Sequence, residues 1–468
     1  MHDMTPTLDT QQPDITKGSL VKHMFLLSWP VVLAMAMHTS YNLVDIFWVG
    51  RVGSSAIAAV SLAGVVFFII LAIGQTLGGG TVALIARAYG AKQYEKVEHI
   101  LGQSVFLSAI MAVGVAFAGV TFSHPIMRIL GAQKEVLDMG TQYLRIVSIG
   151  FGFQLLTFSI NFAFRGAGDM KTPMMIMLVS TILNMVLDPF MILGIGPFPR
   201  MGVQGAAYAT MIAKFVGLIF GFVILLGGKS GLKLRMKEAW PLDGRVAGSL
   251  LAIGVPLGIS YGLMALSGLA VFRLVARFGA EALAALGIGI RVLQIASLPV
   301  VGIGIATTTL VGQNLGAKKK RRVEKIAFQS MGVCSAIMIV LGLAFFFNAR
   351  TLVGIFTPHI DVIQTGMEYI KIASLYLFFI GLTVSMTGAF RGSGYTLPPM
   401  YAGLTKLAVL VGLGYYLSEV YGMGVTGIWW AMVISYGIES AILGAWFSRG
   451  TWKVKRIAIL EEKEPAMA

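Results

Sequence analysis

The sequence predicts an all-α membrane protein with twelve transmembrane helices in two six-helix bundles, related by a pseudo-two-fold axis along the membrane normal. Three observations lead to this fold class. Hydrophobic residues make up 56% of the 468 residues and charged residues only 12%, about half the charged share of a typical soluble domain. Twelve long apolar runs follow one another. The second six runs repeat the pattern of the first six.

Each apolar run is long enough to cross a bilayer, which takes about 20 residues. Basic residues gather in the loops on the N-terminal side of these runs, as between Lys318 and Arg322, whereas the opposite loops carry few. Because basic loops stay in the cytoplasm, we expect a multi-pass plasma-membrane protein with both termini cytoplasmic. We place the spans at 24–49, 55–84, 99–122, 139–163, 173–195, 203–228, 246–274, 281–308, 325–347, 367–390, 396–417 and 424–448.

An internal repeat divides the chain into two halves. Pro30 and Pro256 lie 226 residues apart, and YGAKQYEKVEHI (89–100) resembles LGAKKKRRVEKI (315–326) at the same offset. Each half has an even number of spans, so both halves have the same orientation, and substrate sites in such folds lie near mid-membrane. We expect a cytoplasmic N-terminal segment (1–23), an N-lobe (24–228), a cytoplasmic linker (229–245), a C-lobe (246–448) and a cytoplasmic tail (449–468).

The first span carries a polar stripe. His38, Tyr41, Asn42 and Asp45 recur at i, i+3, i+4 and i+7, which places them on one face of a helix. A carboxylate near mid-membrane costs about 2.5–3.5 kcal/mol and usually faces a cavity or a partner. Asp45 alone could reach the headgroups from the helix end, but a four-residue stripe favours a functional face.

A second polar group lies on the fifth and sixth spans. Asn184 and Asp188 are one turn apart, as are Ala206 and Thr210, and the small Ala206 lets the two helices approach. With Asp45 they predict an oxygen-rich site for a coupling ion. Such a site suits Na⁺ and equally a proton, because close carboxylates titrate as a pair. Taken singly, Thr210 and Asn184 are also typical of ordinary helix packing. No other cofactor is expected.

The fourth span supplies candidate substrate contacts. Gln154, Thr157 and Asn161 recur at i, i+3 and i+7, and Tyr143 lies earlier on the same span. With Tyr41 these side chains could line a cavity for amphipathic cations.

One proline of the first span and five further charged residues in or near the spans need an interpretation; the charged residues are Lys214, Arg273, Arg291, Lys406 and Glu439. Pro30 removes one helix hydrogen bond and can kink the first span, so we expect a hinge, although the matching Pro256 also fits a scaffold role. Glu439 is expected to reach the cytoplasmic surface. Arg291, central in its span, is expected to have an internal partner that the sequence does not identify, and Lys214, Arg273 and Lys406 have no role assigned.

Taken together, these features resemble the multidrug and toxic compound extrusion (MATE) family. The resemblance covers essentially the whole chain: the proline and aspartate of the first span, VGRVG at 49–53, the paired GAK loops and the paired FRGxG motifs. It implies export of cationic or amphipathic compounds in exchange for Na⁺ or H⁺. Asp45, Asn184, Asp188 and Thr210 match the ion site of a prokaryotic branch that keeps its carboxylates in the N-terminal lobe.

Two other classes are considered. A flippase or exporter of a lipid-linked or other amphipathic metabolite has a related fold, but usually additional helices and a cationic cavity. An intramembrane aspartyl protease would need a Tyr-Asp pair, which the sequence lacks, so we expect no enzyme and no catalytic residues. The expected partners are a small-molecule substrate and the lipid bilayer, without nucleic acid, and the expected oligomeric state is a monomer.

Overall fold

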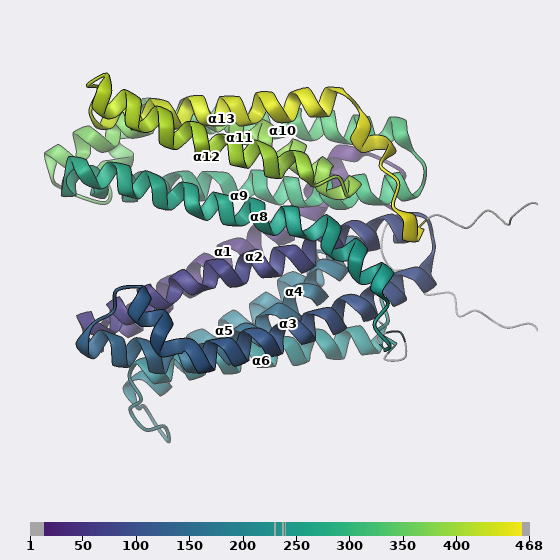
Figure 1. Ribbon diagram of the computed structural model, residues 1–468, viewed down its shortest axis with the longest axis horizontal. Helices are drawn as coiled ribbons and strands as arrows, with labels where there is room; N and C mark the ends of the chain where they lie inside the picture. Colours follow the sequence, from purple (N-terminus) through teal and green to yellow (C-terminus); the bar gives the residue numbers. More distant parts are fainter. Residues whose placement is uncertain (1–13, 229–230, 236–237, 239, 461–468) are drawn as a thin grey trace, which may run out of the picture. The chain divides into compact units, whose positions relative to one another are not determined.

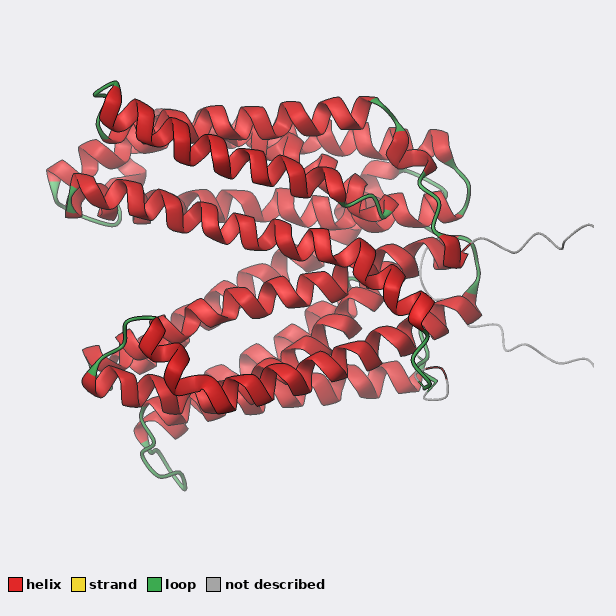
Figure 2. Ribbon diagram, in the orientation of Figure 1, coloured by secondary structure: helices red, strands yellow, loops and turns green. Residues whose placement is uncertain are grey.

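Figure 1 presents the chain as a computed structural model, in which residues 14–228, 231–235, 238 and 240–460 are described. The described residues contain no strand, and twelve of their helices are long and apolar enough to cross a membrane (Figure 2). The predicted all-α fold class with twelve spans is therefore confirmed. The remaining residues, which include the ends of both expected cytoplasmic tails and part of the linker, lie outside this description. The spans are α1 (Leu20–Gly50), α2 (Ser54–Gly90), α3 (Tyr94–Ile129), α4 (Lys134–Ala167), α5 (Lys171–Leu193), α6 (Val203–Gly227), α8 (Gly244–Val275), α9 (Ala280–Gly316), α10 (Lys320–Gly354), α11 (Ile360–Ser393), α12 (Leu397–Tyr415) and α13 (Val425–Ser448).

Several helices are longer than the spans predicted from the sequence. The span expected at 99–122 is α3, which runs from Tyr94 to Ile129, and the span expected at 325–347 is α10, which runs from Lys320 to Gly354. Hydropathy marks only the apolar middle of a helix. The polar turns at its ends keep their backbone hydrogen bonds and continue the helix beyond that stretch.

The described residues form two compact units. Unit 1 contains 14–17, Leu33–Gly254 and 457–460, and unit 2 contains Gly18–Val32 and Val255–Arg456. In unit 1, α4 packs against α2, α3 and α6, and α5 packs against α6. In unit 2, α11 packs against α9, α10 and α13, and α12 packs against α13. Each unit is thus organised around the fourth helix of its half.

Buried hydrogen bonds repeat between the two units. The hydroxyls of Thr81 and Ser104 are bonded in unit 1, and those of Thr307 and Ser330 are bonded in unit 2, 2.7 Å apart. Both pairs keep the 226-residue offset of the sequence repeat. The hydroxyls join the second and third helices of each half where lipid could not hydrogen-bond them, so the repeat includes the polar contacts of the scaffold.

Two helices change unit part of the way along their length. In α1 the change comes just after Pro30, between Val32 and Leu33, and in α8 it comes just before Pro256, after Gly254. The first part of α1 therefore belongs to unit 2, and the first part of α8 belongs to unit 1.

Two glycines allow these first parts to pack closely. A Cβ on Gly254 would lie 1.6 Å from the carbonyl oxygen of Thr76 in unit 1, and a Cβ on Gly302 would lie 3.1 Å from that of Ser28 in unit 2. Thr76 and Gly302 are 226 residues apart, as are Ser28 and Gly254. The same helix contact is therefore made once in each unit.

The described part of the linker is bound to α3. The side-chain amide of Gln103 donates to the carbonyls of Glu238 and Pro241, and its oxygen accepts from the backbone N–H of Asp243. Asp243 then caps α8 by accepting from the backbone N–H of Arg245 at 2.8 Å. That hydrogen bond lowers the pKa of the Asp243 carboxyl group, because it stabilises the ionised form. The described part of the linker thus belongs to unit 1.

Unit 2 buries one ion pair between its last two helices. Lys406 Nζ on α12 lies 2.9 Å from Glu439 Oε2 on α13, and both side chains are nearly inaccessible. The same Nζ is 4.6 Å from the ring centroid of Tyr436. The expectation that Glu439 reaches the cytoplasmic surface is wrong, because the lysine on the neighbouring helix holds it inside the unit.

We predict that Glu439→Gln lowers the thermal unfolding midpoint of the purified protein by several degrees. Removing one partner of a buried ion pair costs about 3–5 kcal/mol, because the other charge is left without its counter-ion. The double variant Lys406→Met/Glu439→Leu removes both charges and should recover most of that loss. The role of the ion pair would be refuted by an unchanged midpoint in Glu439→Gln.

Candidate substrate and ion site

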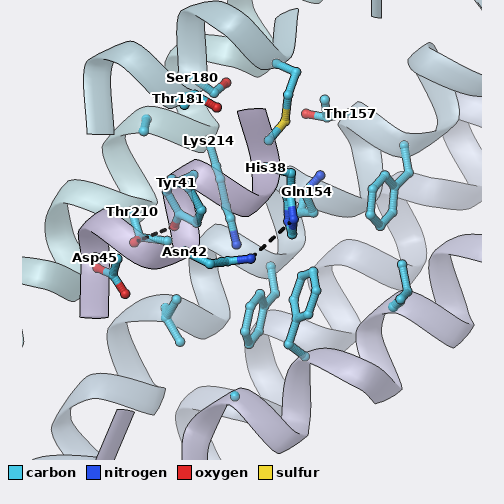
Figure 3. A pocket seen from close by; sticks show the side chains of 18 of the residues that line it. His38, Tyr41, Asn42, Asp45, Gln154, Thr157, Ser180, Thr181, Thr210 and Lys214 are labelled. Carbon is cyan, nitrogen blue, oxygen red and sulfur yellow. Dashed lines mark hydrogen bonds between the residues drawn. The ribbon is translucent and has the colours of Figure 1, made fainter. Parts of the chain in front are cut away.

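The polar stripe of α1 faces a cavity in unit 1. His38, Tyr41, Asn42 and Asp45 all line this cavity, which has a volume of about 530 Å³. Figure 3 shows their side chains on one stretch of α1, directed toward side chains of α4, α5 and α6. The helical spacing of the four residues therefore places them on one cavity wall.

Three candidate ion-site residues are joined by hydrogen bonds, and Tyr41 joins them from α1. Asn184 Nδ2 donates to Asp188 Oδ1 at 3.1 Å and to Thr210 Oγ1 at 3.5 Å. The hydroxyls of Tyr41 and Thr210 are bonded at 3.0 Å (Figure 3). The contacts link α1, α5 and α6. Thr210 lines the cavity, whereas Asn184 and Asp188 do not and connect to it through Thr210.

Three buried oxygens of this group have no hydrogen-bond donor. They are Oδ1 of Asp45, Oδ1 of Asn184 and Oδ2 of Asp188, and their residues are at most 7% exposed. Asp45 and Asp188 also lie close enough to interact electrostatically. Buried acceptors are costly without a partner. Oxygens of carboxylates, amides and hydroxyls are the ligands that a hard cation prefers, so the side chains present fit a monovalent cation or a proton.

Ala206 lies one turn before Thr210 on α6 but contributes no polar atom. It is fully buried in an apolar cluster with Val203 and Ile192. This placement is compatible with the close approach of α5 and α6 that the sequence suggested.

All four candidate substrate residues of α4 line the same cavity. They are Tyr143, Gln154, Thr157 and Asn161. Thr157 donates its hydroxyl to the carbonyl of Phe153 in the preceding turn at 2.8 Å, so its donor is already used. Asn161 Oδ1 is buried and has no donor, which leaves it open to a ligand.

Sequence reasoning missed two charged residues of the cavity, Arg165 on α4 and Lys214 on α6. Lys214 lines the cavity and lies one turn after Thr210 on α6. Its Nζ is 4.6 Å from the ring centroid of Phe151 and 5.7 Å from that of Phe67. The i, i+4 spacing from Thr210 was the available signal, because it places both residues on one face of the helix.

Pro30 does not lie in the cavity. It is buried within α1, two residues before the helix passes from unit 2 to unit 1. The expected hinge residue is therefore separated from Asp45 by about four turns of the same helix.

We predict that Thr210→Val destabilises the protein, because Tyr41 and Asn184 lose the hydroxyl that they contact. A buried polar group left without its partner costs about 1–3 kcal/mol. In a double-mutant cycle with Tyr41→Phe, thermal unfolding should give a coupling energy of about 0.5–1.5 kcal/mol. Thr157→Val is the matched control, since its hydroxyl bonds within its own helix. Additive effects of the two substitutions would show that the hydrogen bond between Tyr41 and Thr210 does not contribute to stability.

A family comparison matches both halves of the chain. The family model named MatE matches residues 30–190 and again residues 256–416. The two matched segments are separated by the same offset of 226 residues that the sequence repeat shows. Together they cover well over half of the chain.

Curated relatives match the chain over nearly its whole length. It is 28% identical to the probable multidrug resistance protein YoeA of Bacillus subtilis, over 96% of this chain and 99% of the relative. It is 29% identical to the probable multidrug resistance protein NorM of Thermotoga maritima, over 94% of this chain and 95% of the relative.

Solved structures share the fold. A structure described as the outward-facing conformation of a multidrug resistance MATE family transporter matches with a TM-score of 0.87 and 24% identity. The match covers 95% of this chain and 99% of that one.

Proposed function

Because the chain belongs to the MatE family of multidrug efflux transporters, we propose that it exports cationic or amphipathic compounds in exchange for Na⁺ or H⁺ by alternating access. The observation that carries this proposal is the group of buried, unpartnered oxygens of Asp45, Asn184 and Asp188 beside the cavity. A protein that needed these residues only for stability would pair those oxygens with donors.

The coupling ion binds between Asp45 and Asp188, which are close enough to interact electrostatically. Asp45 and Asp188 supply negative charge, and Asn184 and Thr210 supply neutral oxygens. A monovalent cation or a proton between the carboxylates relieves the repulsion of two like charges in a medium of low dielectric constant. The chemistry of these ligands suits Na⁺ and a proton alike.

The substrate occupies the neighbouring cavity. Its volume of about 530 Å³ falls within the range of about 300–1,000 Å³ that holds drug-sized ligands. Aromatic rings line it beside Tyr41 and the polar residues of α4. Such a wall binds flat apolar groups of different shapes, while the polar side chains bind their substituents.

Exchange follows from competition for the same negative charge. A cationic substrate and the coupling ion both gain from Asp45, so binding of one weakens binding of the other. If each stabilises a different arrangement of the protein, the difference in affinity drives the transition between arrangements. One monovalent cation moving inward gains about 2.3 kcal/mol per 100 mV, enough for a roughly fifty-fold concentration gradient of exported substrate.

Pro30 provides a hinge for that transition. Proline removes one backbone hydrogen bond and weakens the helix locally, and this one is two residues from the point where α1 changes unit. A bend there would alter the direction of the segment that carries Asp45 without breaking either unit.

The topology that we propose places both termini in the cytoplasm of a monomer in the plasma membrane. The N-lobe (24–228) and C-lobe (246–448) are its two functional halves. The excess of basic residues in the N-terminal-side loops supports this orientation. The test introduces a cysteine into the C-terminal tail and treats intact cells with a membrane-impermeant thiol reagent. Labelling of that cysteine would contradict the proposed orientation.

We predict that Asp45→Asn reaches the membrane but loses gradient-driven efflux of a cationic dye by at least tenfold in proteoliposomes, because the charge that attracts both ligands is gone. In wild type, Na⁺ or protons should weaken equilibrium binding of the dye, and Asp188→Asn should abolish that antagonism. The first substitution removes the charge that attracts both the dye and the ion, and the second removes the other carboxylate of the proposed ion site.

The matched control is Asp361→Asn, which removes an exposed carboxylate at the start of α11. It should leave dye efflux and ion antagonism unchanged. Undiminished efflux by Asp45→Asn, or dye affinity in wild type that is insensitive to both Na⁺ and pH, would show that direct competition at the two carboxylates is wrong.

We predict that Pro30→Ala slows efflux by about tenfold, which corresponds to a barrier higher by about 1.4 kcal/mol, while substrate affinity changes by less than threefold. Restoring the backbone hydrogen bond stiffens α1 but leaves the cavity intact. Efflux rates and equilibrium binding of the same dye measure the two effects. Efflux by Pro30→Ala at the wild-type rate would argue against the hinge.

A further inference from the structure

The proposed function leaves two charged residues of the cavity unused, Arg165 and Lys214, and Lys214 is the one on the same helix face as Thr210. It enters the cavity from α6, and Figure 3 shows its extended side chain ending near Asn42 and His38. The nearby rings of Phe151 and Phe67 lie 4.6 and 5.7 Å from Nζ. A cation over aromatic faces gains electrostatic stabilisation, yet it still seeks an anion when water is scarce.

No carboxylate of the described residues approaches Lys214 closely enough to form an ion pair within 4 Å. Asp45 lines the same cavity and interacts with Lys214 electrostatically, but Asp45 Oδ1 has no hydrogen-bond donor. The positive and the negative group are therefore both in the cavity without neutralising each other by contact. Each remains available to a group of opposite charge on a ligand.

Unit 2 contains a lysine that makes the contrast clear. Lys406 also lies 4.6 Å from an aromatic ring centroid, that of Tyr436, but it pairs with Glu439 at 2.9 Å. The scaffold can therefore supply a buried lysine with a carboxylate from the neighbouring helix. At Lys214 it supplies none, and the side chain projects into a cavity large enough for a ligand.

Neutral hydrogen-bonding groups surround the same place. The side-chain amide of Asn42 contacts His38 Nδ1 at 3.3 Å, and Gln154 lies beside them in Figure 3. An ammonium with amide donors close by is a suitable environment for a carboxylate, which accepts several hydrogen bonds at once. The rings of Phe67 and Phe151 form an apolar wall next to it.

We infer that Lys214 is a specificity-determining residue that selects zwitterionic aromatic compounds, by binding a carboxylate on the ligand while Asp45 attracts its cationic group. This inference rests on the proposed efflux function and narrows its substrate class. A purely cationic ligand meets repulsion from Lys214, whereas a ligand with both charges gains from Asp45 and from Lys214.

The test uses two dyes that differ only by one carboxylate. Rhodamine B carries a free carboxylate and a delocalised cation, and its ethyl ester keeps only the cation. We expect purified wild type to bind the acid about tenfold more tightly than the ester in fluorescence anisotropy, which corresponds to about 1.4 kcal/mol. In Lys214→Met the order should reverse, because the acid loses its partner and the ester loses a repulsive charge.

The controls separate charge from shape and folding. Lys214→Arg keeps the charge and should keep the preference for the acid. Lys371→Met removes a lysine that lies over Phe346 in unit 2 and should leave the ratio of the two affinities unchanged. If Lys214→Met fails to elute as a monodisperse peak, Lys214→Gln replaces it, since glutamine keeps most of the length and the polarity.

Two results would overturn the inference. In the first, wild type binds the acid no more tightly than the ester. In the second, the ratio of the two affinities changes by less than threefold when the charge of Lys214 is removed. Gradient-driven transport of either dye by wild type tests the efflux function separately. If binding selects the acid through Lys214 but neither dye is transported, the efflux function fails while the assignment of Lys214 stands.

Discussion

A charge in the hydrocarbon core of a bilayer is costly unless the protein provides a counter-ion, a hydrogen-bond partner or access to water. Three arrangements of charge among the described residues illustrate that constraint. Lys406 and Glu439 neutralise each other in contact. Asp188 accepts a hydrogen bond through one oxygen and leaves the other without a donor. Lys214 projects into a cavity over aromatic rings. Only the first arrangement brings two opposite charges of the protein into contact.

The duplicated halves separate what the scaffold needs from what the site needs. The hydroxyl pairs Thr81–Ser104 and Thr307–Ser330 occur in both units and bind helices together. The carboxylate of Asp45 has no counterpart, since Val271 occupies the matching position. Aligning GVQG at 202–205 with GVTG at 424–427 places Lys214 opposite Tyr436, the ring that packs against Lys406. The same position is thus structural in one half and faces the cavity in the other.

The sequence predicted the number of spans and the residues of the polar face because both depend on local periodicity. Apolar runs mark helices, and the i, i+4 spacing of Asn184 and Asp188 places them on one face. Whether two such faces meet depends on how helices pack, which one sequence does not reveal. The role of Lys214 was missed for that reason, and Glu439 was assigned to the surface because its partner lies on another helix. The passage of α1 from one unit to the other beside Pro30 also involves contacts far apart in the sequence.

Asp45 and Lys214 in the cavity, with Asp188 beside it, connect ion coupling with substrate choice. With Asp45 and Asp188 ionised and Lys214 protonated, these three residues carry one net negative charge, which a single Na⁺, a single proton or one monovalent cationic ligand neutralises. A zwitterion leaves that net charge in place, because its two charges cancel, so it competes with the coupling ion through contacts at Asp45 rather than through total charge. Antagonism between ion and ligand is therefore expected to be stronger for a cationic compound than for a zwitterion of the same shape. Lys214 thereby affects both which compounds bind and how strongly their binding opposes that of the ion.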